Sequence, residues 1–248
     1  MQSFSVYPGA TDADTLLLAR ADSGWLRGKS IVGPDFTNLG ATPTPESDGW
    51  RFGDAERDYM NVALDGGARM AGTLECWIRN FTTPDTTYHY PVCWFEAGAS
   101  RLAIFLRRSD PTSARIGVYF VDRNAANRSI YWQPNDGSIE ALFDSPKPFH
   151  VAVTFCCDPQ KQVAVIVNGK RYVGTSWSGL VGFSPTTLRL GRNYDGAAAN
   201  DFYGVLDEVR VSNIERYSAD FPITRFQEGE RAGSRGPGET VEVAGGCV

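Results

Sequence analysis

The chain has 248 residues, a formal net charge of −5 and a pI near 5.1. The length suffices for one all-β domain with a sizeable core. The acidic balance argues against nucleic acid and anionic membranes as partners, because phosphate binding depends on clustered Lys and Arg. No apolar run is long enough to span a membrane. The first residues lack the basic and apolar regions of a signal peptide, so we expect synthesis in the cytosol without an export signal.

Short segments rich in Val, Ile, Phe and Tyr alternate with Gly, Pro, Asn and Asp, which predicts many short strands. In chain order they are Thr15–Ala19, Trp50–Phe52, Tyr59–Leu64, Thr73–Phe81, Pro91–Glu96, Arg101–Arg107, Arg115–Val121, Ser129–Trp132, Phe149–Cys157, Gln162–Val167, Lys170–Val173, Thr187–Gly191 and Tyr203–Ser212. One short helix is expected near Ile214–Ser218. This pattern is typical of a sandwich or barrel.

Two turns connect three of these strands. Asn168-Gly169 lies between two apolar runs and predicts a type I′ hairpin, because both residues tolerate a positive φ. Asp158-Pro159 marks a second tight connection just before it. We therefore expect three consecutive antiparallel strands over residues 149–173.

Alternation along the strands assigns their faces, because residues i and i+2 lie on the same side. The aliphatic faces predict a shared core of two packed antiparallel sheets. The expected core residues are Leu102, Ile104, Leu106, Ile116, Val118, Phe120, Val151, Val153, Phe155, Val209 and Val211.

The five cysteines form no CxxC pair, and only two histidines are present, so a zinc site is not expected. Cys76, Cys93 and the Cys156-Cys157 pair lie in apolar runs and are interpreted as buried free thiols.

Residues 227–248 contain six glycines and almost no bulky apolar side chain, so they cannot form a core. We interpret residues 1–226 as one domain and 227–248 as a Gly-rich tail. Within the tail, ETVEV (239–243) alternates like an edge strand. We expect it either to add to a sheet edge or partner surface, or to pack on its own domain.

Several segments resemble one family of domains. FHVAVTFCCDPQKQVAVIVNGKR (149–171) is similar to the hairpin of laminin-G-like and pentraxin-like domains, and LRLGRN (188–193) followed by FYGVLDEVRVSNIERY (202–217) resembles their final strand. TLECWIR (73–79), DYMNVAL (58–64) and TLLLARAD (15–22) resemble earlier elements in the same order. The resemblance implies an all-β, two-sheet jelly-roll sandwich of the laminin-G and concanavalin A-like class, with a recognition role.

No catalytic residues are predicted. Glucanases of the concanavalin-like class use paired carboxylates on one strand, but Glu75 has no acidic partner at i+2 or i+4, and Asp207 and Glu208 are adjacent and point to opposite faces. His150 is interpreted as a structural strand residue and His89 as exposed. A polysaccharide-degrading enzyme is therefore the least favoured interpretation.

Asp207 shares its parity with Val205, Val209 and Val211, so we expect a buried carboxylate with at least two hydrogen-bond donors or a metal nearby. The resemblance implies that calcium is possible. The candidate ligands are Asp195, Asp201 and Asp207. No other cofactor is expected.

Aromatic and Arg side chains on the non-core parity are typical of interface hot spots. The expected contact residues are Arg101, Phe105, Arg107, Tyr119 and Trp132, the last in a rim loop. The alternative is that another part of the chain covers this face.

Together these features favour a non-enzymatic structural module of a virion. It would lie in a phage tail or on the capsid surface, within an oligomeric assembly, and contact neighbouring virion proteins or a host-surface glycan. A free-standing carbohydrate-binding lectin is the alternative.

Overall fold

The structure is a computed structural model. It describes residues 4–5, 14–19, 30–32, 37–38, 44–46, 49–53, 59–82, 90–97, 100–108, 114–121, 127–134, 136–157, 161–173, 184–192, 201–221, 223 and 240–241. Asp158-Pro159, His89 and Asp195, which were singled out above, lie outside these residues.

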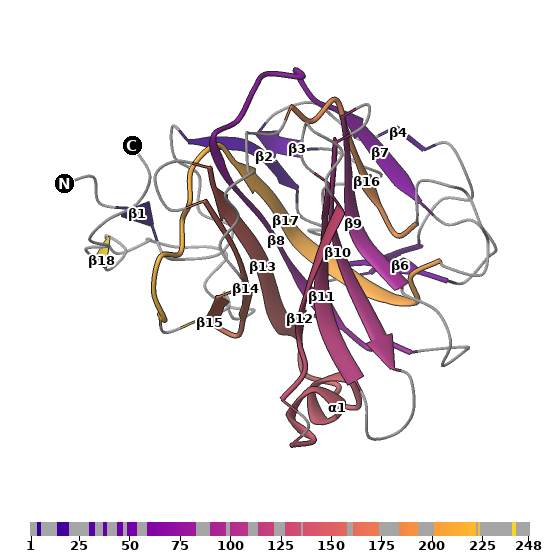
Figure 1. The fold of residues 1–248 in the computed structure, drawn as a ribbon. Helices are drawn as coiled ribbons and strands as arrows, with labels where there is room; N and C mark the ends of the chain where they lie inside the picture. The colour runs from indigo at the N-terminus through magenta and orange to yellow at the C-terminus, as the bar shows by residue number, and fades with distance from the viewer. Residues whose placement is uncertain are drawn as a thin grey trace.

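The described residues form an all-β sandwich of two antiparallel sheets, with one short helix among them (Figure 1). One sheet has seven strands in the order β12 (Asn127–Trp132), β11 (Ala114–Val121), β10 (Ser100–Arg108), β9 (Tyr90–Ala97), β16 (Thr187–Leu190), β7 (Met60–Ala63) and β4 (Thr37–Asn38). Figure 1 shows β9–β12 as one layer, facing β13, β8 and β17 in the other.

The second sheet has nine strands. Seven follow the order β15 (Lys170–Val173), β14 (Gln162–Val167), β13 (Phe149–Cys156), β8 (Ala71–Arg79), β17 (Gly204–Ser212), β2 (Thr15–Ala19) and β3 (Ser30–Val32). The other two are β6 (Gly49–Phe52), which pairs with β17, and β5 (Thr44–Glu46), which pairs with β6. Strand β17 therefore lies at the centre of this sheet.

All thirteen predicted strands are present, with ends that differ by at most two residues. The Asn168-Gly169 hairpin is confirmed, because both residues have positive φ, 48° and 78°, and Val167 pairs with Lys170. The Asn168 side chain also accepts a hydrogen bond from the backbone N–H of His150 at 2.9 Å, which ties the turn to β13.

The inter-sheet core contains every residue predicted for it. Leu102, Ile104 and Leu106 of β10 face Ile116, Val118 and Phe120 of β11 in register, and all six are fully buried. Aliphatic alternation therefore sufficed to place the core face of these two strands.

The expected helix near Ile214–Ser218 is absent. Residues 213–221 instead form an irregular strap across the outer face of the nine-stranded sheet. Their backbone groups bond to that sheet: the Thr73 hydroxyl donates to the Ile214 carbonyl at 2.8 Å, and Arg171 Nε donates to the Tyr217 carbonyl at 3.0 Å. The sheet thus competes with the intrahelical bonds that a helix would need.

The helix α1 (Ser138–Phe143) was not predicted. It begins after Gly137 at φ 77°, and the Asp136 side chain accepts the Ser138 backbone N–H at 2.9 Å. Ile139 and Phe143 anchor it to the core. Six residues are too few to show a helical periodicity in the sequence.

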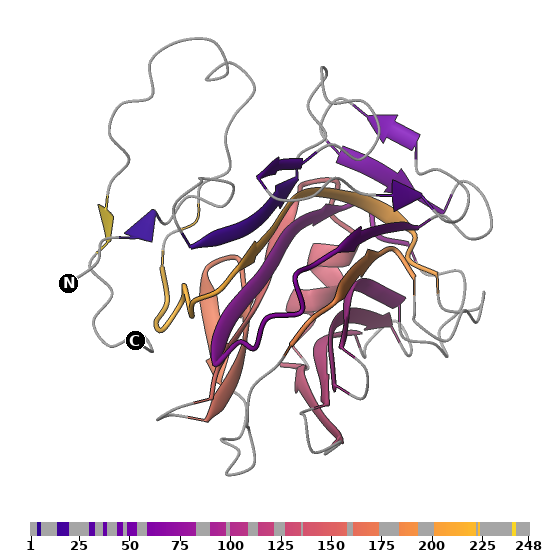
Figure 2. The ribbon, with the colours of Figure 1, turned by 90° about the horizontal axis from the view of Figure 1, so that it is seen from above.

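Two further expectations concern the cysteines and the tail. Cys76, Cys93 and Cys157 are buried free thiols as expected, but Cys156 is disulfide-bonded, so that assignment was wrong. In the tail, β18 (Thr240–Val241) does form a strand, and it pairs with β1 (Phe4–Ser5) of the same chain rather than with a sheet of the sandwich (Figure 2).

Candidate functional site

The outer face of the seven-stranded sheet collects arginine and aromatic side chains. In the β10–β11 ladder Arg107 pairs with Arg115, Phe105 with Gly117, and Ala103 with Tyr119. Cross-strand partners lie on the same side of a sheet, and their neighbours along each strand belong to the core. Arg101, Phe105, Arg107 and Tyr119 therefore share one outer face, as predicted.

We expected Phe105 to be exposed, but only 5% of its surface is accessible. Its ring lies over Gly117, where a Cβ atom would approach Phe105 Cζ to 2.2 Å. Tyr131 of β12 pairs with Gly117 from the opposite side. Its ring contacts the edge of the Phe105 ring, with the two centroids 5.6 Å apart. Phe105 is thus a buried ring that packs beneath this surface, and Tyr131 is the ring that is accessible to a partner.

Tyr131 is 42% exposed, and it and Met70 are the large exposed hydrophobic side chains among the described residues. The Arg115 guanidinium lies 4.9 Å from the Tyr131 ring centroid, within cation–π range. The pair holds a cation and an aromatic face side by side at the surface. Sequence reasoning missed Tyr131. Arg115 and Gly117 are outward residues of β11, and Tyr131 is the residue of β12 that pairs with Gly117, so alternation along both strands could have assigned it to the outer face.

A second arginine–tyrosine contact lies on the same sheet. Arg189 of β16 pairs in register with Asn61 of β7, and its Nε donates to Asn61 Oδ1 at 3.0 Å. Its guanidinium lies 5.2 Å from the Tyr59 ring centroid, and that of Arg192 lies 5.6 Å from it. The amide of Asn61 fixes the orientation of the Arg189 side chain.

Trp132 does not belong to this face. It is the last residue of β12 rather than part of a loop, and it pairs with Ile116, a core residue. Its ring stacks on Tyr172 of β15, with centroids 4.3 Å apart. Because β12 and β15 are edge strands of opposite sheets, this stack closes one side of the sandwich. Its strand parity, opposite to that of Tyr131, is the reason that the prediction failed.

Asp207 is buried as predicted, but its parity assignment was wrong. It pairs with Trp77, on the face opposite that of the core residues Leu206 and Val209. The ladder shifts between Asp207 and Arg210, and Glu208 has a φ of 49°, which marks a β-bulge. One extra residue reverses the alternation, so Val209 faces the core although Asp207 does not.

The calcium candidates do not converge in the described part of the chain. Asp201 is buried and its Oδ1 lies 3.3 Å from Arg192 Nε, an ion pair that neutralises it. Among the described residues no three His, Cys, Asp or Glu side chains are grouped closely enough to hold a metal ion.

A buried polar cluster lies under the strap 213–221. Glu75 of β8 accepts hydrogen bonds from Arg210 Nε, from His150 Nε2 at 2.8 Å and from the Tyr217 hydroxyl at 2.5 Å. Glu75, His150 and Arg210 are all fully buried. Burial by itself raises the pKa of Glu75, but the Arg210 charge and the His150 hydrogen bond outweigh it, so the pKa lies well below the ordinary value.

This cluster holds the strap to the sheet and is closed to substrate. Trp77 and Tyr217 cover His150, with ring centroids 5.5 and 6.0 Å from its own. His150 is therefore the structural strand residue that was predicted, and Glu75, singled out as an acidic strand residue, is an internal counter-ion.

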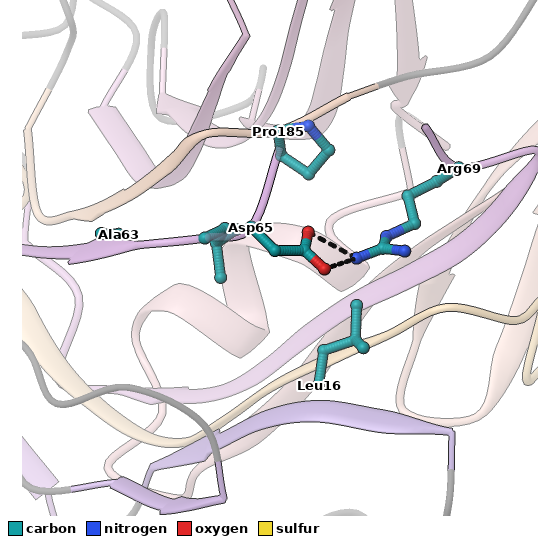
Figure 3. Close-up of a pocket in the computed structure, with 6 residues that line it drawn as sticks. Leu16, Ala63, Asp65, Arg69 and Pro185 are labelled. Atoms are coloured by element: carbon teal, nitrogen blue, oxygen red, sulfur yellow. Dashed lines mark hydrogen bonds and ion pairs between the residues drawn. The ribbon is translucent and has the colours of Figure 1, made fainter. Parts of the chain in front are cut away.

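A cavity of about 380 Å³ opens between the two sheets on another side of the sandwich. Its walls are Leu16 of β2, Ala63 of β7, Leu64 and Pro185, and its mouth is crossed by Asp65 and Arg69. Figure 3 shows the Asp65 carboxylate turned toward Arg69, with Leu16 on one side and Pro185 on the other.

The ion pair at this mouth is well organised. Arg69 donates to both carboxylate oxygens of Asp65, at 2.6 and 2.7 Å, and the Gly67 N–H donates to Oδ1 at 2.9 Å. The Gly67 hydrogen bond and the Arg69 side chain lower the pKa of Asp65. With its charges already paired, the cavity offers mainly aliphatic walls, and sequence reasoning did not predict it.

Comparison with known proteins identifies the fold but no family. No family model matches the sequence, and no curated protein matches it. Among solved structures, the binding domain of botulinum neurotoxin serotype D is 15% identical, with a TM-score of 0.59 over 82% of this chain and 49% of that one. The binding domain of Paraclostridial Mosquitocidal Protein 1 is 14% identical, with a TM-score of 0.60 over 81% and 49%.

The binding domain of botulinum neurotoxin DC, in a complex with rat synaptotagmin II, gives a TM-score of 0.58 at 14% identity over 82% and 48%. The chain thus spans about half the length of the solved structures that it matches. At these identities the likeness shows a shared β-sandwich fold. No helix in the described part is long and apolar enough to cross a membrane.

Proposed function

We propose that this protein is a non-enzymatic binding module that contacts its partner through the outer face of the seven-stranded sheet. The observation that carries the proposal is the Arg115–Tyr131 pair, an exposed ring beside a guanidinium on the β11–β12 ladder at the edge of this sheet. Aromatic and Arg side chains are enriched at interface hot spots. The similar solved structures are described as binding domains, which supports the same class of function.

The laminin-G-like resemblance also suggests the kind of assembly in which this module acts. The segments that carry it form the β13–β14–β15 meander and the central strand β17. Such domains are common in bacteriophage particles, so we place the protein in a virion, in the tail or on the capsid surface, where it contacts neighbouring subunits or host glycans. A free-standing lectin would use the same face without the particle.

Two parallel assays test the proposal: binding of the purified protein to a glycan array, and its co-sedimentation with virions. Tyr131→Ala and Arg115→Gln should weaken the productive interaction about tenfold or more, the usual effect of losing a hot spot. Lys147→Gln and Met70→Ala are matched controls, because they remove an exposed charge and an exposed apolar side chain elsewhere. If all four variants behave like the wild type in both assays, this face is not the contact surface.

A further inference from the structure

The cavity beside the Asp65–Arg69 ion pair has the size and composition of a small-molecule site. Its volume of about 380 Å³ lies at the lower end of the range of roughly 300–1,000 Å³ that is usual for such sites. Leu16, Leu64 and Pro185 give it aliphatic walls, and the polar side chains in its described lining are those of Asp65 and Arg69. In Figure 3 the ion pair lies between Leu16 and Pro185. A ligand that fits this cavity therefore combines an apolar body with one polar head.

The rim of the cavity is held in place by backbone hydrogen bonds. The Leu64 N–H donates to the Thr186 carbonyl at 2.8 Å, and the Gly66 N–H donates to the Pro185 carbonyl at 3.1 Å. Gly66 has a φ of 69°, so the chain turns there. These bonds attach the segment after β7 to the segment before β16. A site that is already ordered loses less entropy when a ligand binds.

The ion pair at the mouth has hydrogen-bonding capacity left. Arg69 donates to the Asp65 carboxylate through Nη2, and its Nη1 has no acceptor among the described residues. Oδ2 of Asp65 accepts one hydrogen bond, from Arg69, although a carboxylate oxygen can accept two. The side chains of Asp65 and Arg69 are 65% and 18% accessible. The pair can therefore accept one further hydrogen bond and donate another.

The two charges at the mouth balance each other. The Gly67 N–H and the Arg69 side chain lower the pKa of Asp65, so this carboxylate is ionised at neutral pH, and among the described residues Arg69 is its charged neighbour. A ligand carboxylate would be attracted by Arg69 but repelled by Asp65, and an ammonium group would meet the reverse. Either ion would also lose hydration. A neutral head avoids both costs.

From this arrangement we infer that the cavity binds a neutral N-acyl amide, with its acyl group against Leu16, Leu64 and Pro185. The amide carbonyl accepts from Arg69 Nη1 and the amide N–H donates to Asp65 Oδ2. Hydrogen bonds to charged groups are the stronger ones, and an amide has its donor and acceptor on separate atoms, whereas a hydroxyl would serve both partners with one oxygen. Acylated amino sugars and acylated alkylamines share this chemistry. The inference goes beyond the proposed function and does not depend on it, because the cavity is separate from the proposed contact face.

The test is a ligand-observed NMR titration of the full-length protein with probes of matched length. N-methylhexanamide carries the neutral amide, hexanoate and hexylammonium carry one charge each, and 1-hexanol carries a hydroxyl. We expect N-methylhexanamide to bind at least about tenfold more tightly than the other three. N-acetylglucosamine distinguishes the two sources of the amide: tighter binding than N-methylhexanamide assigns the site to acylated amino sugars, and weaker binding assigns it to longer acyl chains.

Two substitutions locate the binding and test the role of charge. Leu16→Trp fills the cavity and should weaken amide binding about tenfold or more. Asp65→Asn leaves the Arg69 charge unbalanced, so hexanoate should now bind more tightly than the amide. Asp144→Asn is the matched control, because it removes a carboxylate of similar exposure, 64%, from its ion pair with Arg108 elsewhere on the surface, and it should change neither affinity. Melting temperatures show whether each variant is folded.

Four results would overturn the inference. If hexanoate or hexylammonium binds the wild type as tightly as the amide, the head that the site selects is not neutral. If 1-hexanol binds equally, the amide is not recognised. If folded Leu16→Trp keeps full affinity, or if Asp65→Asn behaves like Asp144→Asn, binding does not occur in this cavity. If no probe binds at millimolar concentrations, the cavity is not a ligand site.

Discussion

Glu75→Gln should be among the most destabilising single substitutions in this protein. The change keeps the shape of the side chain but leaves the Arg210 guanidinium, which is fully buried, without its counter-charge. Removing one member of a buried ion pair costs about 3–5 kcal/mol. For a domain of this size each kcal/mol shifts the melting temperature by about 2–4 °C, so the expected loss is roughly 6–20 °C.

The loss in the free energy of unfolding is measured by urea denaturation followed by circular dichroism. Asp65→Asn is the matched control. It removes the same charge from an exposed pair, where the Asp65 side chain is 65% accessible, and should cost no more than about 1 kcal/mol. Replacing both partners, in Glu75→Leu with Arg210→Met, removes the buried charge of Arg210 together with that of Glu75. It also leaves His150 Nε2 and the Tyr217 hydroxyl without their acceptor, so it should recover only part of the loss. If Glu75→Gln costs no more than Asp65→Asn, the buried cluster does not hold the strap as we describe.

The same carboxylate predicts a pH dependence. Its folded-state pKa lies below the ordinary glutamate value of 4.5. A depressed pKa contributes stability that is present above the unfolded value and is lost as the pH falls below it. The wild-type free energy of unfolding should therefore decline as the pH falls below about 4.5, and Glu75→Gln should flatten that decline. Equal slopes for the two proteins would argue against this role of Glu75.

Three further predictions follow from the packing. Gly117→Ala places a Cβ 2.2 Å from Phe105 Cζ and should cost about 1–3 kcal/mol, a loss that Phe105→Leu relieves when combined with it; an unchanged urea midpoint would contradict the contact. Trp132→Ala removes the stack on Tyr172 and should lower the free energy of unfolding by about 1–3 kcal/mol while glycan affinity stays the same. A loss of affinity without a loss of stability would show that Trp132 belongs to the binding surface. Deleting residues 227–248 should abolish assembly but lower the melting temperature by less than about 3 °C, because the two-residue β1–β18 ladder stabilises the domain little. The melting temperature is measured with a reductant because Cys156 is disulfide-bonded. If the truncated domain unfolds, the tail is not an arm that serves assembly.

The sequence was informative wherever one local pattern decides the structure. Alternation placed the core faces of β10 and β11, and the Asn168-Gly169 dipeptide predicted its hairpin because few other residues adopt two positive φ values in succession. Strands of two or three residues, such as Thr37–Asn38 and Ser30–Val32, are too short to carry an alternation and were missed.

Other features depend on contacts between distant residues and left no local signal. Glu75, His150, Arg210 and Tyr217 come from three strands and the strap, so no spacing in the sequence brings them together. The bulge at Glu208 reversed the faces of β17 part-way along the strand, which is why Asp207 was correctly predicted as buried but assigned to the wrong side.

The central place of β17 in its sheet has a consequence for how the chain folds as it is made. This strand lies between β8 and β2, and it also pairs with β6, so it joins three strands from the first 79 residues to one near the C-terminal end of the chain. During synthesis, β2 and β6 must remain without their main partner until residues 204–212 have left the ribosome. Pairings of such long sequence separation make folding slow and leave apolar strands exposed in the meantime. We therefore expect nascent chains that stop before β17 to need chaperones, whereas chains that include it complete the sheet in a single late step.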